Sequence, residues 1–120
     1  MALRLTDLDV DGVTVVVLDG RIVLGEESSA LREKVKGLLA EGKKKLVLDM
    51  KNITTIDSSG LGALVAAYSS AKTAGASLRL CSLGERSNQL LQMTKLYTVF
   101  EVSNTEADAV LAMSKAASAD

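Results

Sequence analysis

The side chains best suited to chemistry in this chain lie in one short run, Asp57-Ser58-Ser59-Gly60-Leu61-Gly62. Apolar residues before the run predict a buried strand, and an apolar-periodic segment after it predicts a helix, so the run is expected to form the turn between them. The first N–H groups of a helix have no partner within the helix and favour negative charge. Such a turn is suited to bind an anion or to present a serine hydroxyl at the surface.

Three interpretations of this turn compete. In the first, Ser58 or Ser59 caps the helix, Asp57 forms local hydrogen bonds and the glycines serve packing. In the second, Gly60-Leu61-Gly62 begins the glycine-rich phosphate loop of a nucleotide-binding fold. Val65 stands where that pattern requires a third glycine, and no acidic residue closes the next strand, so we reject the nucleotide site.

In the third interpretation, a serine of the turn accepts a phosphoryl group. The helix N-terminus would stabilise the phosphate, so the fold itself would tolerate the modification. The phosphate would add a charge of about −1.5 to −2 to a chain whose formal net charge is −1. A partner docked over the turn would then face a desolvated dianion beside Asp57, and one modification would act as a switch.

The composition excludes most catalytic chemistry. The chain has no histidine, which removes the Ser-His and Cys-His pairs that activate most nucleophiles and also the commonest ligand of zinc. We therefore expect no enzyme activity, no catalytic residue, no bound metal and no cofactor. The only cysteine, Cys81, follows the alternating Leu78-Arg79-Leu80 and is expected to be a buried thiol on a strand.

Charge and hydropathy exclude two classes of partner. The formal net charge of −1, with Lys43-Lys44-Lys45 as the densest basic run, does not fit a nucleic-acid-binding protein. No apolar run has the character of a signal peptide or the length of a membrane span. A single cysteine excludes an intramolecular disulfide and favours a reducing compartment. The sequence thus predicts a cytoplasmic protein that does not insert into a membrane.

The predicted elements form one α/β domain over residues 1–120, in the order β-β-α-β-α-β-α-β-α. This order gives a mixed β-sheet of four to five strands with about four helices. Asp11-Gly12 is the turn of the first hairpin, a loop holding Ile53 and Ile56 follows the third strand, and residues 114–120 are expected to fray. Asn104 or Thr105 is expected to cap the final helix. The predicted strands are 3–10, 13–18, 46–48, 77–81 and 99–102, and the predicted helices are 26–40, 59–73, 86–96 and 105–116.

The stretch Ile56–Gly62, together with Leu46-Val47-Leu48-Asp49 before it, resembles the core of the STAS domain (sulphate transporter and anti-sigma antagonist). It is most similar to the free-standing anti-sigma factor antagonists of bacteria. The resemblance covers almost the whole chain and implies the STAS fold. It also includes Gly20-Arg21-Ile22, Leu90–Leu96, Val99–Val102 and Glu106-Ala107.

The resemblance implies a function as well. Proteins of this family bind an anti-sigma factor, often itself a serine protein kinase, and so release a sigma factor for transcription. The kinase phosphorylates the serine directly after the Asp, which is Ser58 here, and a phosphatase restores binding. Gly60 and Gly62 would leave room for the partner. The residues that the resemblance places at the partner surface are Arg21, Val23, Asp57, Ser58, Ser59, Gly60, Leu61 and Gly62.

Two alternatives concern the partner. Val23 stands where the family often has an aspartate, so this chain could serve a different anti-sigma protein. The chain could instead be an accessory subunit of a membrane transporter for lipids or anions, with the same turn as its docking surface. Phosphorylation would then have no role.

Overall fold

A leucine-rich strand and a valine-rich strand, joined at Asp11-Gly12, begin the sheet. In the computed structural model, which describes residues 3–118 and their side chains through Ser114, β1 (Leu3–Val10) and β2 (Val13–Ile22) pair antiparallel. The φ angles of Asp11 and Gly12 are 52° and 81°, as a two-residue hairpin turn of type I′ requires. The predicted hairpin is confirmed.

Three further strands extend the sheet in parallel, each reached through a helical crossover. The strand order is β1-β2-β3-β4-β5, and the predicted order of elements is confirmed, with one added 3₁₀ turn at Leu96–Thr98. The strands are β3 (Lys45–Ile56), β4 (Ser77–Cys81) and β5 (Glu101–Ser103), and the helices are α1 (Glu26–Ala40), α2 (Ser58–Thr73), α3 (Glu85–Thr94) and α4 (Glu106–Ser118).

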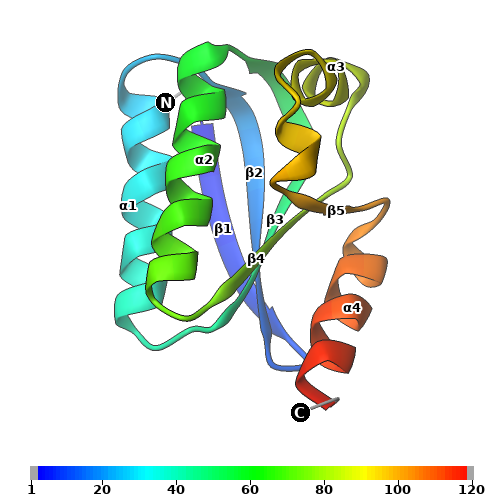
Figure 1. Cartoon of the computed structure of the whole chain (residues 1–120). Helices are drawn as coiled ribbons and strands as arrows, with labels where there is room; N and C mark the ends of the chain where they lie inside the picture. The colour runs from blue at the N-terminus through cyan, green and yellow to red at the C-terminus, as the bar shows by residue number, and fades with distance from the viewer. Residues whose placement is uncertain (1–2, 119–120) are drawn as a thin grey trace.

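Helices cover both faces of the sheet. Helices α1 and α2 lie side by side across one face (Figure 1), and α4 packs against β2, β3, β4 and β5. Because strand side chains alternate between faces, the core divides into two clusters. The larger one lies under α1, α2 and α3 and includes Val16, Leu18, Leu31, Leu48, Leu64, Leu80 and Leu91. The smaller one lies under α4 and consists of Val13, Val15, Val47, Cys81, Ala109, Val110 and Met113.

The third strand is four times longer than predicted, and this difference shapes the functional end of the molecule. The loop expected around Ile53 is instead the second half of β3. Pairing with β4 ends at Asp49 opposite Cys81, but pairing with β2 continues to Ile56 opposite Ile22, across two register shifts that each place an extra residue on β3. Polar residues suit this extension because it borders one strand instead of two. The second strand, predicted to end at residue 18, pairs with this extension and therefore continues to Ile22.

The C-terminal elements also differ in their boundaries. The expected strand over 99–102 begins only at Glu101, because Phe100 turns into the core, where its ring meets Tyr68 edge-on at 5.5 Å between centroids. Helix α4 continues to Ser118, so the helix includes most of the tail expected to fray, and residues 119–120 lie outside the described part of the chain. Thr105 is the cap, since its Oγ1 accepts a hydrogen bond from the Asp108 N–H at 3.1 Å.

Candidate functional site

Asp57 connects the end of β3 to the start of α2. Its backbone is extended, and its Oδ1 accepts a hydrogen bond from the Gly60 N–H at 2.8 Å, which makes it the N-cap of α2. The expectation that Ser58 or Ser59 caps this helix is wrong. A carboxylate one residue earlier reaches the same N–H, and Ser58 and Ser59 become the first two residues of the helix.

The same carboxylate also holds the segment that follows β2. Asp57 Oδ2 accepts a hydrogen bond from the Leu24 N–H at 3.2 Å, and the Asp57 N–H donates to the carbonyl of Ile22 at 3.3 Å. Asp57 is thus a clip between two segments that lie more than thirty residues apart in the sequence. These N–H donors, that of Gly60 first, lower the pKa of Asp57 below its ordinary value of 3.8, so the group is charged at neutral pH.

Gly60 is required by packing. A Cβ built at this position would lie 2.0 Å from the Ile22 carbonyl oxygen and 2.8 Å from the Ile22 carbonyl carbon, so only glycine lets α2 approach β2 this closely. Gly60 and Leu61 are both buried. They form the inner side of the turn, and the expectation that Gly60 leaves room for a partner is corrected: it leaves room for β2. Gly62 is exposed, with nothing within 4 Å of a Cβ placed there.

The outer side of the turn carries the two serines. Ser58 is exposed and Ser59 is partly buried. Ser58 therefore presents its hydroxyl to solvent at a helix N-terminus, immediately beside a charged carboxylate. The sequence predicted both features for a modifiable serine, namely the helix N-terminus and the neighbouring carboxylate. It did not predict that Asp57 is the residue that caps the helix.

The segment between β2 and α1 lies next to this turn. Arg21 is exposed and Val23 is partly buried, while the Val23 carbonyl accepts a hydrogen bond from the buried Ser28 hydroxyl at 2.8 Å. Gly25, with a φ of 109°, turns the chain into α1. The structure therefore brings Arg21 and Val23 to the same end of the molecule as Ser58.

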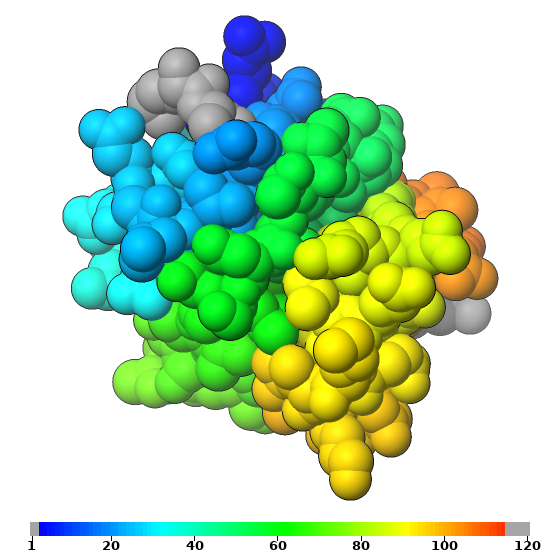
Figure 2. Space-filling view, turned by 90° about the horizontal axis from the view of Figure 1, so that it is seen from above, coloured from blue at the N-terminus to red at the C-terminus, as the bar shows by residue number. Residues whose placement is uncertain are grey.

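Leu24 is a member of this surface that the sequence did not predict. Its side chain is 77% exposed although its backbone is held by Asp57. A leucine in this segment is expected to be a core residue, and only the glycine after it indicates a turn that could expose the leucine side chain. Figure 2 looks onto this end, where residues 20–30 in blue to cyan border the start of α2 in green, and α3 in yellow lies on the other side of the green atoms.

Other residues singled out by sequence have local partners. Cys81 is fully buried as expected, and burial raises the pKa of its thiol to about 11. Lys43 forms an ion pair with Asp9 at 3.4 Å, and Lys44 donates to the Ala74 carbonyl at 2.6 Å. Among residues 3–118, acidic and sulfur-bearing side chains form no group of three that could hold a metal ion. No helix in that range has the length and hydropathy of a membrane span.

These features define a small α/β domain that presents a strand-to-helix turn, with an exposed serine, at one end of a mixed sheet. The chain belongs to the STAS domain family, whose model matches residues 7–109.

Relatives and solved structures agree with this assignment. The Anti-sigma-B factor antagonist of Bacillus subtilis is 36% identical over 73 residues, which are 61% of this chain and 66% of that protein. The crystal structure of an anti-sigma factor antagonist from Mycobacterium paratuberculosis has a TM-score of 0.80 at 24% identity and covers 92% of this chain and 93% of its own. The Bacillus protein SpoIIAA, solved in its phosphorylated form, has a TM-score of 0.68 at 17% identity, with 91% and 96% covered.

The same fold occurs within a membrane transporter. The structure of the murine anion transporter Slc26a9 has a TM-score of 0.71 at 21% identity, and the match covers 87% of this chain but 18% of that one. At these identities the structural likenesses establish the fold alone.

Proposed function

We propose that this chain is an anti-sigma factor antagonist that binds an anti-sigma factor and is switched off when Ser58 is phosphorylated. The observation that carries the proposal is the position of Ser58. It is the exposed first residue of α2, directly after the capping Asp57, in a STAS-family chain whose relative in Bacillus subtilis is named an Anti-sigma-B factor antagonist. The partner would be a serine protein kinase, and the chain would have no catalytic activity of its own.

The geometry of the turn supports a phosphate at Ser58 without damage to the fold. The hydroxyl faces solvent, so the modification needs no repacking, and the helix N-terminus stabilises added negative charge. The fold therefore accommodates the phosphate at the turn itself, without rearrangement elsewhere. The effect falls on the partner, which must desolvate the phosphate when it docks.

The charge of Asp57 adds to the weakening of partner binding by the phosphate. Its lowered pKa keeps the carboxylate charged, so a phosphate of about −1.5 to −2 would stand beside a full negative charge. A docked surface complementary to the unmodified turn would face both charges with little water between them. Like-charge juxtaposition at an interface costs several kcal/mol, which corresponds to affinity weaker by on the order of 100-fold.

The proposed partner surface also includes Arg21, Val23, Leu24, Ser59 and Gly62. They are exposed or partly buried and lie on the two segments that Asp57 holds together. Val23 in place of the aspartate common in the family makes this surface less acidic. We propose that it selects an anti-sigma factor whose contact at this point is apolar.

The acceptor is tested with the cognate anti-sigma kinase and ATP. Wild type is expected to gain the mass of one phosphate, Ser58→Ala none, and Ser59→Ala as much as wild type, because the Ser58 hydroxyl is the exposed one. Peptide mapping assigns the position. A phosphate on Ser59, or equal labelling of the Ser58→Ala variant, would show that Ser58 is not the switch.

Binding is tested by titration of the anti-sigma factor with the unmodified and the phosphorylated chain. The phosphorylated chain is expected to bind on the order of 100-fold more weakly, and a phosphatase that removes the phosphate is expected to restore the affinity. If the unmodified chain does not bind the anti-sigma factor but co-purifies with a permease or an ATPase, the function as an antagonist is refuted in favour of a transporter subunit.

A further inference from the structure

The face of the sheet that α4 covers is open along its edge strand. In the part of the chain that the structure describes, the smaller core cluster takes its helix residues from α4 alone, and α4 packs against β2, β3, β4 and β5. On β1, Leu8 pairs with Val15 and Val10 pairs with Val13, and both valines of β2 belong to this cluster. Directly opposed residues of an antiparallel pair point to the same face, so Leu8 lies on the α4 side. It is nevertheless 43% exposed.

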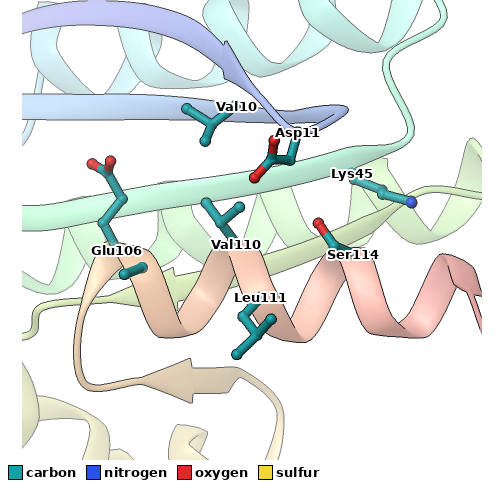
Figure 3. A pocket seen from close by; sticks show the side chains of 8 residues that line it. Val10, Asp11, Lys45, Glu106, Val110, Leu111 and Ser114 are labelled. Carbon is teal, nitrogen blue, oxygen red and sulfur yellow. The ribbon is translucent and has the colours of Figure 1, made fainter.

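A groove of about 750 Å³ lies between α4 and the first hairpin. Its apolar walls are Val10 from β1 and Ala107, Val110 and Leu111 from α4. Figure 3 shows Val10 above the helix, on the same side as Val110. Leu111 is 56% exposed. Exposed apolar side chains gathered around a groove mark an interaction surface.

The two ends of the groove carry opposite charges. Glu106 stands at the first turn of α4, and Lys45 lies at the other end, beyond Ser114 (Figure 3). Neither forms an ion pair with another described side chain. Asp11 lies between them along the groove, exposed on the turn of the hairpin. The groove therefore suits a partner that brings a cation to Glu106 and an anion to Lys45.

We propose that a second copy of this chain occupies the groove, and that the two α4 helices lie side by side and antiparallel between the two sheets. Each α4 then covers the open face of β1 in the other copy, with Leu111 of one copy over Leu8 of the other. In a two-fold interface every contact occurs twice. The antiparallel arrangement brings Glu106 of each copy to Lys45 of the other, so all four charges are paired.

The chain itself carries what the groove lacks. Neighbouring helices pack about 8–10 Å apart, which is about two strand spacings of 4.7–4.9 Å. A second helix beside α4 would therefore lie over the first hairpin, where Leu8 is exposed. The second α4 supplies the apolar Leu111 for this surface and begins with the charge that Lys45 requires. The turn at Ser58 remains uncovered, because the start of α2 lies at the opposite end of the sheet from this hairpin (Figure 1).

The environment of Glu106 agrees with a cation from outside the chain. Asp49, then partial burial, raises the pKa of Glu106 above its ordinary value of 4.5, and Lys51 opposes this shift only in part. The charged form of Glu106 thus lacks full stabilisation within its own chain. A lysine brought close by a second copy would favour that charged form.

Sedimentation velocity measures the association. Wild type is expected to shift from monomer to dimer as its concentration rises toward about 1 mM, and a chain that stays monomeric there would overturn the proposal. Leu111→Asp places a charge in the apolar part of the interface and is expected to weaken dimerisation by on the order of 100-fold. Met93→Asp is the matched control, since Met93 is 79% exposed on α3, and it is expected to dimerise as wild type does. Equal association of the two variants would exclude Leu111 from the interface and overturn the proposal.

Reversal of the charges tests the two-fold pairing. Lys45→Glu would place two glutamates at each end of the interface, and Glu106→Lys would place two lysines there. Each variant alone is expected to dimerise on the order of 100-fold more weakly than wild type. A mixture of the two is expected to form a heterodimer, because each glutamate then faces a lysine of the other chain. Lys36→Glu makes the same charge change on α1, where Lys36 is exposed, and is expected to dimerise as wild type does.

The mixture also separates the interface from folding, because a chain that fails to fold is not rescued by another chain. Circular dichroism of each variant is expected to match wild type. Single variants that dimerise as tightly as wild type, or a mixture of folded variants that does not associate, would overturn the proposal. These measurements use no anti-sigma factor and no kinase, so their outcome is independent of the function proposed for Ser58.

Discussion

The first turns of α2 contain two glycines for which the structure predicts opposite effects of the same substitution. At Gly60 an added Cβ would meet the backbone of Ile22 at 2.0 Å, and at Gly62 it would meet nothing within 4 Å. The obstacle at Gly60 is a carbonyl of β2 at the point where Ile22 pairs with Ile56. It cannot rotate away as a side chain could.

The expected magnitudes follow from two opposing contributions. Alanine is favoured over glycine in a helix by about 1 kcal/mol, so Gly62→Ala is expected to raise the free energy of unfolding by roughly 0.5–1 kcal/mol. Gly60→Ala has the same gain, but overpacking costs about 1–3 kcal/mol, and a contact with backbone at this distance belongs at the upper end. The net loss is then about 2 kcal/mol, and the two variants should differ by about 3 kcal/mol.

Urea unfolding followed by circular dichroism measures both variants against wild type, with the slope against urea concentration as a check on two-state behaviour. Gly62→Ala is the matched control, since it changes the same atom in the same helix. If Gly60→Ala were as stable as Gly62→Ala, the close approach of α2 to β2 would be refuted. If Gly62→Ala weakened binding of the anti-sigma factor without loss of stability, a partner contact at Gly62 would be supported.

The remaining predictions concern the two helix caps. Asp57→Asn weakens both hydrogen bonds that the carboxylate accepts, so we expect a lower melting temperature and faster proteolysis between β2 and α1. The pKa of Asp57 is lowered from 3.8, so the carboxylate stabilises the fold fully above that pH, and this stabilisation is lost as the pH falls through the lowered value. Wild type should therefore lose more stability on acidification than Asp57→Asn. Equal losses would contradict the role of Asp57 as a clip between the two segments. Thr105→Ala removes the acceptor for the Asp108 N–H and should cost about 1 kcal/mol in urea unfolding, whereas Thr105→Ser should cost little, and equal losses would exclude the hydroxyl as the cap.

Much of the fold could be predicted because it rests on local patterns. Asp11-Gly12 predicted a hairpin since that pair accepts two positive φ angles, which the structure has. Leu31, Val35 and Leu38 predicted α1 because their spacing places them on one helix face, and all three are buried. The exposed Ser58 could be predicted in the same way, from an apolar strand and an apolar-periodic helix on either side of a polar run.

The extension of β3 could not be predicted, because its polar residues have no periodicity that distinguishes a strand from a loop. Residues 51–56 form a strand because they pair with the second half of β2, and no local sequence pattern indicates this pairing. The sequence left the role of Gly60 open between packing and partner contact for a related reason. A glycine that opens a helix fits a partner's approach as well as it fits close packing, and only the position of the Ile22 carbonyl decides between them.

The sequence by itself determined the order of the elements, the buried character of Cys81 and the position of a serine at a strand-to-helix turn, because each follows from residue types and spacings along the chain. The tertiary structure decided which side chain caps α2 and which glycine is indispensable. Asp57 reaches Leu24, and the Ile22 carbonyl lies against Gly60, across separations at which the sequence contains no periodicity. Contacts of that kind depend on how strands are paired and helices are packed, and these emerge only when the whole chain folds.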